Sequence, residues 1–380
     1  MRKVAIVGST GSIGKNTLDV IRRHPDLFTV SALVAGGNAA ELARQCREFR
    51  PAAAALCDGA RADEFRKTAG DSARAVFFGK NAGADALRAS GADICLSAAG
   101  GLAGLPPTLA AIDCGMDIAL ANKETLVAAG DIIMPLMAGK KLSLRPVDSE
   151  HSALAQALRA GAPREVSRLI ITGSGGAFRD WPAEKMALAT AADALRHPTW
   201  SMGKKITVDS ATLANKALEV IEAHHLFAVP YEKIAVYIHP QSVVHGAVEF
   251  TDGALLAQLA MPDMRLPILY ALTGGERRET GIAPLTLDKM AELTFSRPDP
   301  QKFPMLELGL AAGKQGGLAP AVYSAANEAA VELFLAGKIS YPQIAARVAK
   351  ALERAPSAPV TLENIVDADA DARAVARAGE

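Results

Sequence analysis

The sequence predicts an α/β protein with an N-terminal Rossmann-like nucleotide-binding domain, a central α/β domain and a C-terminal helical domain. Over the first 145 residues, short apolar runs alternate with segments of helical length. This alternation is typical of a parallel sheet joined by right-handed crossover helices. A glycine-rich turn directly follows the first apolar run. From residue 305 to residue 380 the pattern is mostly helical.

The N-terminal domain is expected to span residues 1–150. Its buried strands are predicted at 4–7, 29–34, 53–56, 76–78, 94–97 and 118–121. Helical patterns lie between them at 15–23, 39–49 and 105–113.

The second half is expected to form a central domain over 151–273, a linker over 274–304 and a helical domain over 305–380. Strands are predicted at 168–172, 205–208, 234–239, 243–250 and 255–259. The linker is rich in glycine, proline and charge, which is typical of irregular chain. The clearest helices of the tail are expected at 321–335 and 341–352.

Composition excludes several classes of protein. The 41 basic and 41 acidic residues cancel, so we expect no nucleic-acid or membrane partner. No run of about 18 apolar residues is uninterrupted, and the N-terminal apolar run is too short for a signal peptide. The four cysteines form no CxxC pair. We therefore expect a cytoplasmic protein without a disulfide scaffold or zinc ribbon.

The first candidate site is the turn Gly8-Ser9-Thr10-Gly11-Ser12-Ile13-Gly14, between a strand and a helix. Glycines there permit close approach of main-chain N–H groups to a pyrophosphate, although an ordinary strand–helix turn is the alternative. The second strand ends in Gly36-Gly37-Asn38, without the carboxylate that NAD-selective sites usually carry. NADP is therefore the favoured cofactor, although no cationic side chain lies in that turn.

The second candidate site is a group of carboxylates. Asp148 and Glu150 alternate in a segment expected to be extended, so their side chains can converge. Glu219 follows Asn215 by four residues on a helix predicted to be capped near Asp209 or Ser210. Three carboxylates favour Mg²⁺ or Mn²⁺ over zinc. From spacing alone, solvated surface carboxylates are the commoner explanation.

Three further segments carry polar residues of interest. Ser174 lies in a Gly-rich turn after a strand, where main-chain amides can form an anion-binding nest or a flexible loop. Lys123 follows a strand at the ligand-binding edge of the sheet, although a lone lysine is more often a surface charge. His197 and Trp200 lie in a Pro- and Gly-rich loop that suggests a lid, with a structural loop as the alternative.

Together these segments resemble the 1-deoxy-D-xylulose 5-phosphate reductoisomerase family of the non-mevalonate isoprenoid route. The motifs that carry the resemblance run in order from residue 8 to residue 265: GSTGSIG (8–14), LANKETLV (120–127), PVDSEH (146–151), TGSGGAF (172–178), RHPTWSMG (196–203), VDSATLANKALE (208–219), HPQSVVH (239–245) and MPDMR (261–265). The resemblance implies NADPH-dependent, metal-assisted rearrangement and reduction of a phosphorylated sugar, by a retro-aldol/aldol sequence or an α-ketol shift.

The resemblance also implies a role for each matching residue. Catalysis is assigned to Lys123, Asp148, Glu150 and Glu219, of which the three carboxylates bind Mg²⁺ or Mn²⁺, with Co²⁺ as a third candidate. Substrate binding is assigned to Lys123, Ser149, Glu150, Ser174, His197, Ser210, Asn215, Lys216 and Glu219, together with Trp200 and Met202 in a lid loop at about 174–204. NADPH binding is assigned to Thr10, Gly11, Ser12, Ile13, Gly36, Asn38, Asn122, Glu124 and Gly203. Pro262 and Met264 would pack near the reacting carbon and the nicotinamide, and a homodimer is implied.

Two positions depart from the family pattern. Ala177 replaces a common proline after the Ser174 turn, and Gly37 replaces a lysine or another polar residue, which leaves open how the cofactor 2′-phosphate is held. Two other functions are compatible with the architecture: another NADP-dependent reductase of phosphorylated ketoses, and a catalytically silent NADPH-binding regulator. The regulator would be expected to lack one of the four catalytic residues, all of which are present.

Overall fold

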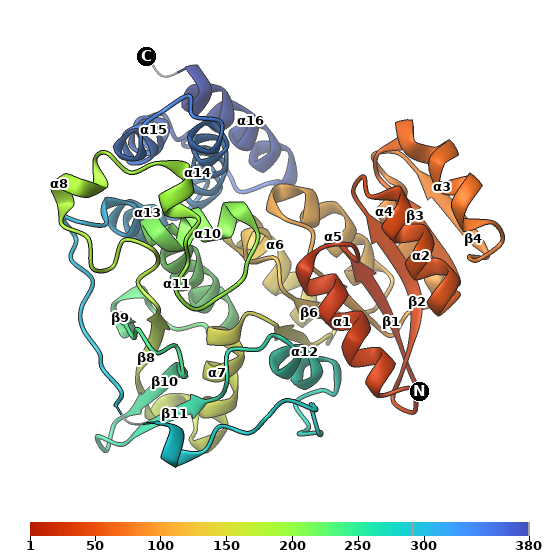
Figure 1. Ribbon diagram of the computed structural model, residues 1–380, viewed down its shortest axis with the longest axis horizontal. Helices are drawn as coiled ribbons and strands as arrows, with labels where there is room; N and C mark the ends of the chain where they lie inside the picture. The colour runs from red at the N-terminus through yellow and green to blue at the C-terminus, as the bar shows by residue number, and fades with distance from the viewer. Residues whose placement is uncertain (291, 379–380) are drawn as a thin grey trace. The chain divides into compact units, whose positions relative to one another are not determined.

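The structure is a computed structural model that describes residues 1–290 and 292–378 (Figure 1). Its chain forms two compact units, and each is assembled from separate stretches of sequence. The first unit contains residues 1–122, 133–148 and 264–281, and the second contains residues 123–132, 149–263 and 282–380. The predicted α/β fold class is confirmed, while the predicted division into three domains and a linker stays a prediction.

The first unit is built on a seven-stranded parallel sheet in the order β4-β3-β2-β1-β5-β6-β7. Its strands are β1 (Arg2–Val7), β2 (Phe28–Ala35), β3 (Ala53–Leu56), β4 (Ala75–Phe78), β5 (Ile94–Ser97), β6 (Asp117–Leu120) and β7 (Leu144–Pro146). The six predicted strands are all present, and β7 was not predicted. Because the winding reverses between β1 and β5, ligands of this fold bind at the carboxyl ends of those strands.

The helices of the first unit cover this sheet. They are α1 (Ser12–Arg23), α2 (Ala39–Phe49), α3 (Ala62–Ala69), α4 (Ala82–Ser90), α5 (Leu105–Asp113) and α12 (Arg265–Leu272), with short 3-10 turns η1 (Gly59–Arg61) and η2 (Gly101–Gly104). The late helix α12 packs beside α1, as Figure 1 shows. Leu33, Leu42 and Ile94 are fully buried in the core, where truncation to alanine typically costs about 2–5 kcal/mol.

Helix α6 (Lys123–Gly139) belongs to both units. Its first part, to residue 132, lies in the second unit, and the rest lies in the first. Ala129 has non-helical dihedral angles, φ −136° and ψ 21°, so the helix kinks there, and Pro135 interrupts its hydrogen bonding further along.

The second unit contains a mixed four-stranded sheet in the order β11-β10-β8-β9. Its strands are β8 (Val166–Gly173), β9 (Ile234–Ile238), β10 (Val244–Phe250) and β11 (Leu255–Leu259). Strand β8 is parallel to β9 and antiparallel to β10. The strand predicted at 205–208 is wrong, because these residues lie in helix α10 (Lys204–Thr212). The β-branched run Ile206-Thr207-Val208 imitates a buried strand, and a buried helical face has the same composition.

The remaining helices also belong to the second unit. They are α7 (Ser149–Ala157), α8 (Ala183–Met186), α9 (Ala191–Ala194), α10, α11 (Ala214–Phe227), α13 (Pro304–Gln315), α14 (Ala319–Leu335), α15 (Tyr341–Glu353) and α16 (Leu362–Ala378). Short 3-10 turns are η3 (Leu158–Ala160), η4 (Pro163–Glu165), η5 (Tyr231–Lys233) and η6 (Leu287–Lys289). Helices α14, α15 and α16 pack together at the C-terminal end (Figure 1). The sequence predicted that this part of the chain is helical. Across the described residues, no helix combines the length and apolarity needed to cross a membrane.

Candidate active site

The glycine-rich loop between β1 and α1 has a main-chain shape that only glycine allows. Gly8 has a φ of 86°, and a Cβ there would lie 2.6 Å from the carbonyl oxygen of Ala98. A Cβ on Gly14 would lie 2.4 Å from the carbonyl oxygen of Gly8. The Gly8 N–H donates to the carbonyl of Val34 at 2.8 Å, which ties the loop to the end of β2. Helix α1 begins at Ser12, and the N–H groups of its first turn lack helical acceptors and can bind a phosphate.

Two buried polar atoms near this edge of the sheet have no hydrogen-bond partner among the described residues. They are the Ser9 hydroxyl, in the loop itself, and Asn122 Oδ1. The Asn122 amide nitrogen donates to the carbonyl of Gly101 at 3.0 Å, which holds the turn η2. Buried polar atoms are rarely left unpaired, so these two fit a site that a polar ligand completes. Asn38 caps α2 by accepting from the N–H of Glu41 at 3.1 Å.

In the second unit, Glu124 takes part in a partly buried charge network that sequence reasoning missed. Lys205 Nζ lies 2.8 Å from Glu124 Oε1 and 2.8 Å from Asp209 Oδ2. The other oxygen of Asp209 accepts from Asn327 Nδ2 on α14 at 2.9 Å. Burial would raise the pKa of Glu124, but the Lys205 ammonium outweighs it and the pKa is lowered. The network fixes α10 just after Gly203, which precedes the helix.

The three predicted metal ligands lie together. One ligand oxygen each from Asp148, Glu150 and Glu219 lies within 4.8 Å of the others. The sequence analysis expected Asp148 and Glu150 to converge because they alternate in an extended segment. That expectation was wrong, because Glu150 lies in the first turn of helix α7. Asp148 immediately precedes that helix, and Glu219 is fully buried on α11. Three convergent carboxylate oxygens are the donors that a hard divalent cation prefers, so the residues fit Mg²⁺ or Mn²⁺.

Two lysines neutralise much of this negative charge. Lys123 Nζ lies 3.0 Å from Glu219 Oε1 and donates to Asn215 Oδ1 at 2.9 Å. Lys216 Nζ lies 2.7 Å from Glu219 Oε2, pairs with Glu150 and donates to the carbonyl of Thr172 at 3.0 Å. Both side chains are only 6% exposed. Neither lysine is therefore a surface charge, although that is the commoner situation for a lone lysine after a strand.

The charges of this cluster support one another. Burial would raise the pKa of Glu150, but the ammonium groups of Lys216 and Lys123 hold it well below its usual range. Burial would lower the pKa of Lys216, but Glu150 and Glu219 raise it. Glu150 and Lys216 are therefore both charged at neutral pH.

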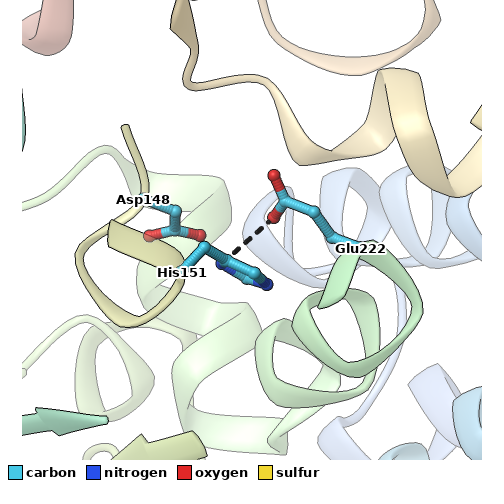
Figure 2. A group of neighbouring side chains, drawn as sticks. All are labelled: Asp148, His151 and Glu222. Carbon is cyan, nitrogen blue, oxygen red and sulfur yellow. Dashed lines mark ion pairs between the residues drawn. The ribbon is translucent and has the colours of Figure 1, made fainter. Parts of the chain in front are cut away.

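Sequence reasoning also missed the pair His151 and Glu222 beside the carboxylates. Figure 2 shows the His151 ring between Asp148 and Glu222, with His151 Nδ1 3.4 Å from Glu222 Oε2. His151 Nε2 lies 2.8 Å from the carbonyl oxygen of Glu219, and both His151 and Glu222 are fully buried. The imidazole thus ties α7 to the turn of α11 that carries Glu219. The only signal in the sequence was the spacing of Glu222, three residues after Glu219.

The turn after β8 is the predicted anion-binding nest. Gly175 and Gly176 have φ values of 83° and 66°, and the Gly176 N–H donates to Ser174 Oγ at 3.1 Å. A Cβ on Gly176 would lie 2.4 Å from the carbonyl oxygen of Ser210, so the turn packs closely on α10. Main-chain N–H groups of such a turn can bind an anion. The close packing argues against a flexible loop, and the binding of an anion by this turn stays a prediction.

His197 joins this nest to helix α10. Its Nε2 lies 2.9 Å from Ser174 Oγ and 3.2 Å from Ser210 Oγ. Its Nδ1 accepts from the N–H groups of Thr199 and Trp200 at 3.1 and 2.8 Å, so the proton of the neutral ring lies on Nε2. Burial, together with the positive charges of Lys216 and Arg179, lowers the pKa of His197 to about 4. The cations that disfavour a charged imidazole favour a phosphate dianion at the same place.

Replacement of His197 by glutamine is expected to raise KM and lower kcat together, because the loop that it anchors would no longer be held to both serines. In the unsubstituted protein, NMR titration should find a His197 pKa of about 4. Because this pKa is below the unfolded value, His197 opposes folding as the pH falls from about 6.5 toward 4. An effect of the substitution on thermal stability alone, with normal kinetics, would favour the structural-loop interpretation.

The other predicted substrate residues lie nearby in the second unit. Ser149 Oγ donates to Glu150 Oε2 at 2.5 Å. The Trp200 ring lies 6.1 Å from the ring of His245 on β10, centroid to centroid. Residues 196–203, which include Met202, form neither helix nor strand. Their role as a lid stays a prediction. In the first unit, Met264 packs against the core of the sheet, and a place for it beside the nicotinamide is likewise a prediction.

The fold and the site place the chain in the class of dinucleotide-binding α/β enzymes with a carboxylate site for a divalent cation. Comparison with known proteins narrows this class. The family model of 1-deoxy-D-xylulose 5-phosphate reductoisomerase matches residues 4–130. Two family models of the C-terminal domains of this enzyme match residues 144–227 and 259–375. The chain belongs to the 1-deoxy-D-xylulose 5-phosphate reductoisomerase family.

Similar proteins match over nearly the whole chain. The reductoisomerases of Chlorobaculum tepidum and Chlorobium chlorochromatii are 49% and 50% identical over 378 residues, which is 99% of this chain and 99% of each relative. The Zymomonas mobilis reductoisomerase in complex with NADPH is 42% identical, with a TM-score of 0.92 over 99% of this chain and 98% of its own. A DOX-P reductoisomerase in complex with NADPH, fosmidomycin and magnesium is 37% identical, with a TM-score of 0.94 over 100% and 98%.

Proposed function

We propose that this protein converts 1-deoxy-D-xylulose 5-phosphate to 2-C-methyl-D-erythritol 4-phosphate with NADPH and a divalent cation, in isoprenoid precursor biosynthesis. The observation that carries this proposal is the convergence of Asp148, Glu150 and Glu219 within 4.8 Å, in a chain of this family. Mg²⁺ is the proposed cation because a related structure contains magnesium, and Mn²⁺ has the same ligand preference. A cytoplasmic location stays a prediction of the sequence.

The residues of this chain supply binding, orientation and charge. Bound NADPH supplies hydride, and a bound divalent cation polarises the carbonyl and an adjacent hydroxyl of the sugar. Asp148, Glu150 and Glu219 would hold the cation. Lys123, now paired with Glu219, can turn its ammonium to negative charge that develops on substrate oxygen, and in this buried place such charge is strongly stabilised.

The nest at Ser174 would bind the phosphate of the sugar. Ser174 and Ser210 share the Nε2–H of His197, and Arg179 donates to the carbonyl of Ser174 at 3.0 Å. The phosphate lies at the end of the sugar remote from the reacting carbonyl. Its binding free energy can therefore orient the substrate and organise the loop around His197 before reaction.

The test is NADPH oxidation in the presence of 1-deoxy-D-xylulose 5-phosphate, with and without EDTA. Oxidation that EDTA abolishes and added Mg²⁺ restores would support the substrate, the cofactor and the cation together. If NADPH binds but is not oxidised, the sugar assignment is wrong, and other phosphorylated ketoses become the substrates to try.

We also propose a homodimer that is formed through strand β11. This strand is at the edge of its sheet and pairs with β10 on one side. Leu255, Leu256 and Leu259 are 57%, 42% and 36% exposed, and nearby Met261 is 42% exposed. An apolar edge strand of this kind is normally covered, and a second copy related by two-fold symmetry would cover it with its own β11.

Sedimentation is expected to give the mass of two chains, and Leu256→Glu is expected to give the mass of one, because a carboxylate would be buried without a partner. Leu188→Glu is the matched control, because Leu188 is 84% exposed and lies outside β11. A monomeric unsubstituted protein, or a Leu256→Glu variant that remains dimeric, would contradict this interface.

A further inference from the structure

The end of strand β2 lies where nucleotide-binding folds of this type distinguish NADPH from NADH. In such folds, a carboxylate at this end binds the ribose 2′-hydroxyl of NADH, and an arginine accommodates the 2′-phosphate of NADPH. Strand β2 ends at Ala35 and is followed by Gly36-Gly37-Asn38, which contains no charged side chain. The Asn38 side chain caps helix α2. The turn therefore contains no side chain that could distinguish the two cofactors by charge.

The neighbouring strand β3 brings a carboxylate to this turn. The N–H of Asp58 donates to the carbonyl of Gly36 at 2.7 Å, so the two strand ends are joined. A Cβ on Gly37 would lie 3.5 Å from Asp58 Oδ2, an ordinary van der Waals contact. Asp58 Oδ1 accepts from the N–H of Ala60 at 3.1 Å and caps the turn η1. The carboxylate is therefore held beside Gly37.

An arginine on η1 partners that carboxylate. Arg61 Nε lies 3.5 Å from Asp58 Oδ2, and Arg61 Nη1 lies 3.6 Å from Glu64 Oε2. Both separations are longer than a normal hydrogen bond, and the Arg61 side chain is 53% exposed. The guanidinium can therefore reorient at little cost toward a stronger partner. A phosphate, which accepts two parallel hydrogen bonds from the guanidinium, is such a partner.

We propose that Asp58 and Arg61 determine the preference of this protein for NADPH, with Arg61 binding the 2′-phosphate and Asp58 holding Arg61 beside Gly37. Alone, Asp58 would favour the 2′-hydroxyl of NADH and repel a 2′-phosphate. Paired with Arg61, its charge is balanced, and the phosphate gains a cation that the β2 turn does not supply. This inference rests on the proposed function, because it concerns the cofactor of that reaction.

The experiment measures dissociation constants of NADPH and NADH for the full chain by isothermal titration calorimetry. Arg61→Ala is expected to weaken NADPH binding by about tenfold or more and to leave NADH binding within about twofold, because only NADPH loses a charge-assisted hydrogen bond. The matched control is Arg88→Ala, since Arg88 is also exposed and paired with an acid three residues away on its helix. The control should leave both constants unchanged.

A second variant tests the charge itself. Gly37 does not have a positive φ, and a side chain there has room, so Gly37→Lys can be introduced into Arg61→Ala. The double variant is expected to regain most of the lost NADPH affinity, because its ammonium would lie beside Asp58. If Arg61→Ala keeps the NADPH preference, or if the unsubstituted protein binds both cofactors equally, the inference is overturned. If the unsubstituted protein does not bind NADPH, the proposed function fails, and the inference fails with it.

Discussion

Replacement of Glu219 by glutamine is expected to lower turnover by well over tenfold while the protein remains folded. The Glu219 carboxylate is the centre of the charged cluster, because Lys123, Lys216 and Asn215 all contact its two oxygens. The amide keeps the size of the side chain but removes the charge that a divalent cation needs. The measurements are kcat, circular dichroism and the affinity for Mn²⁺, which is followed by electron paramagnetic resonance.

The matched control for this variant is Glu332→Gln. Glu332 lies on α14, is more than half exposed, and pairs with Arg377 at 3.1 Å. An exposed ion pair contributes little, so kinetics and Mn²⁺ affinity should be unchanged in the control. Near-normal turnover and Mn²⁺ affinity in Glu219→Gln would remove Glu219 from the set of metal ligands.

Replacement of Lys123 by methionine is expected to lower kcat by about 10²- to 10³-fold, the usual effect of removing one group that stabilises charge in the transition state. Methionine keeps the length of the side chain and loses its charge. Lys123 is nearly inaccessible and begins helix α6, and its ammonium lies near Glu219 and Asn215, within the charged cluster. Steady-state kinetics separate the expected loss in kcat from a change in KM.

Lys140→Met serves as the control, since Lys140 directly follows the other end of the same helix, and its side chain, which pairs with Asp113, is 39% exposed. Turnover of the control should be normal. If Lys123→Met loses less than about tenfold in kcat and changes only KM, Lys123 is a binding residue whose charge does not act in the chemical step.

Much of the fold could be predicted because its signals are local. The strands of the parallel sheet are apolar runs between helical patterns, and six of the seven were found from periodicity and length. Strand β7 has only three residues, one of which is the proline at 146, so it gave no usable signal. The run at 206–208 was misassigned because burial on a helix and burial in a sheet select the same β-branched residues.

The candidate site was predictable in its composition and not in its geometry. The motifs predicted the three carboxylates and Lys123 as site residues. Which side chains meet is decided by contacts between residues that are far apart in the sequence. His151 and Glu222 lie 71 residues apart, and Asp58 lies beside a glycine that follows another strand. The spacing of Glu219 and Glu222 was the only sequence signal for the first contact, and the second contact had none. Arg61 was overlooked because its place near Gly37 becomes recognisable only once β2 and β3 are paired, although its partner Asp58 is only three residues away.

The two ammonium groups at Glu219 also bear on how the protein matures. In small zinc domains, the acidic or thiolate ligands repel one another until the ion arrives, and folding waits for the ion. Here Lys123 and Lys216 already balance two of the three carboxylate charges of Asp148, Glu150 and Glu219. The charges of the site are therefore largely balanced without the cation, so folding of this chain need not wait for the ion as it does in small zinc domains.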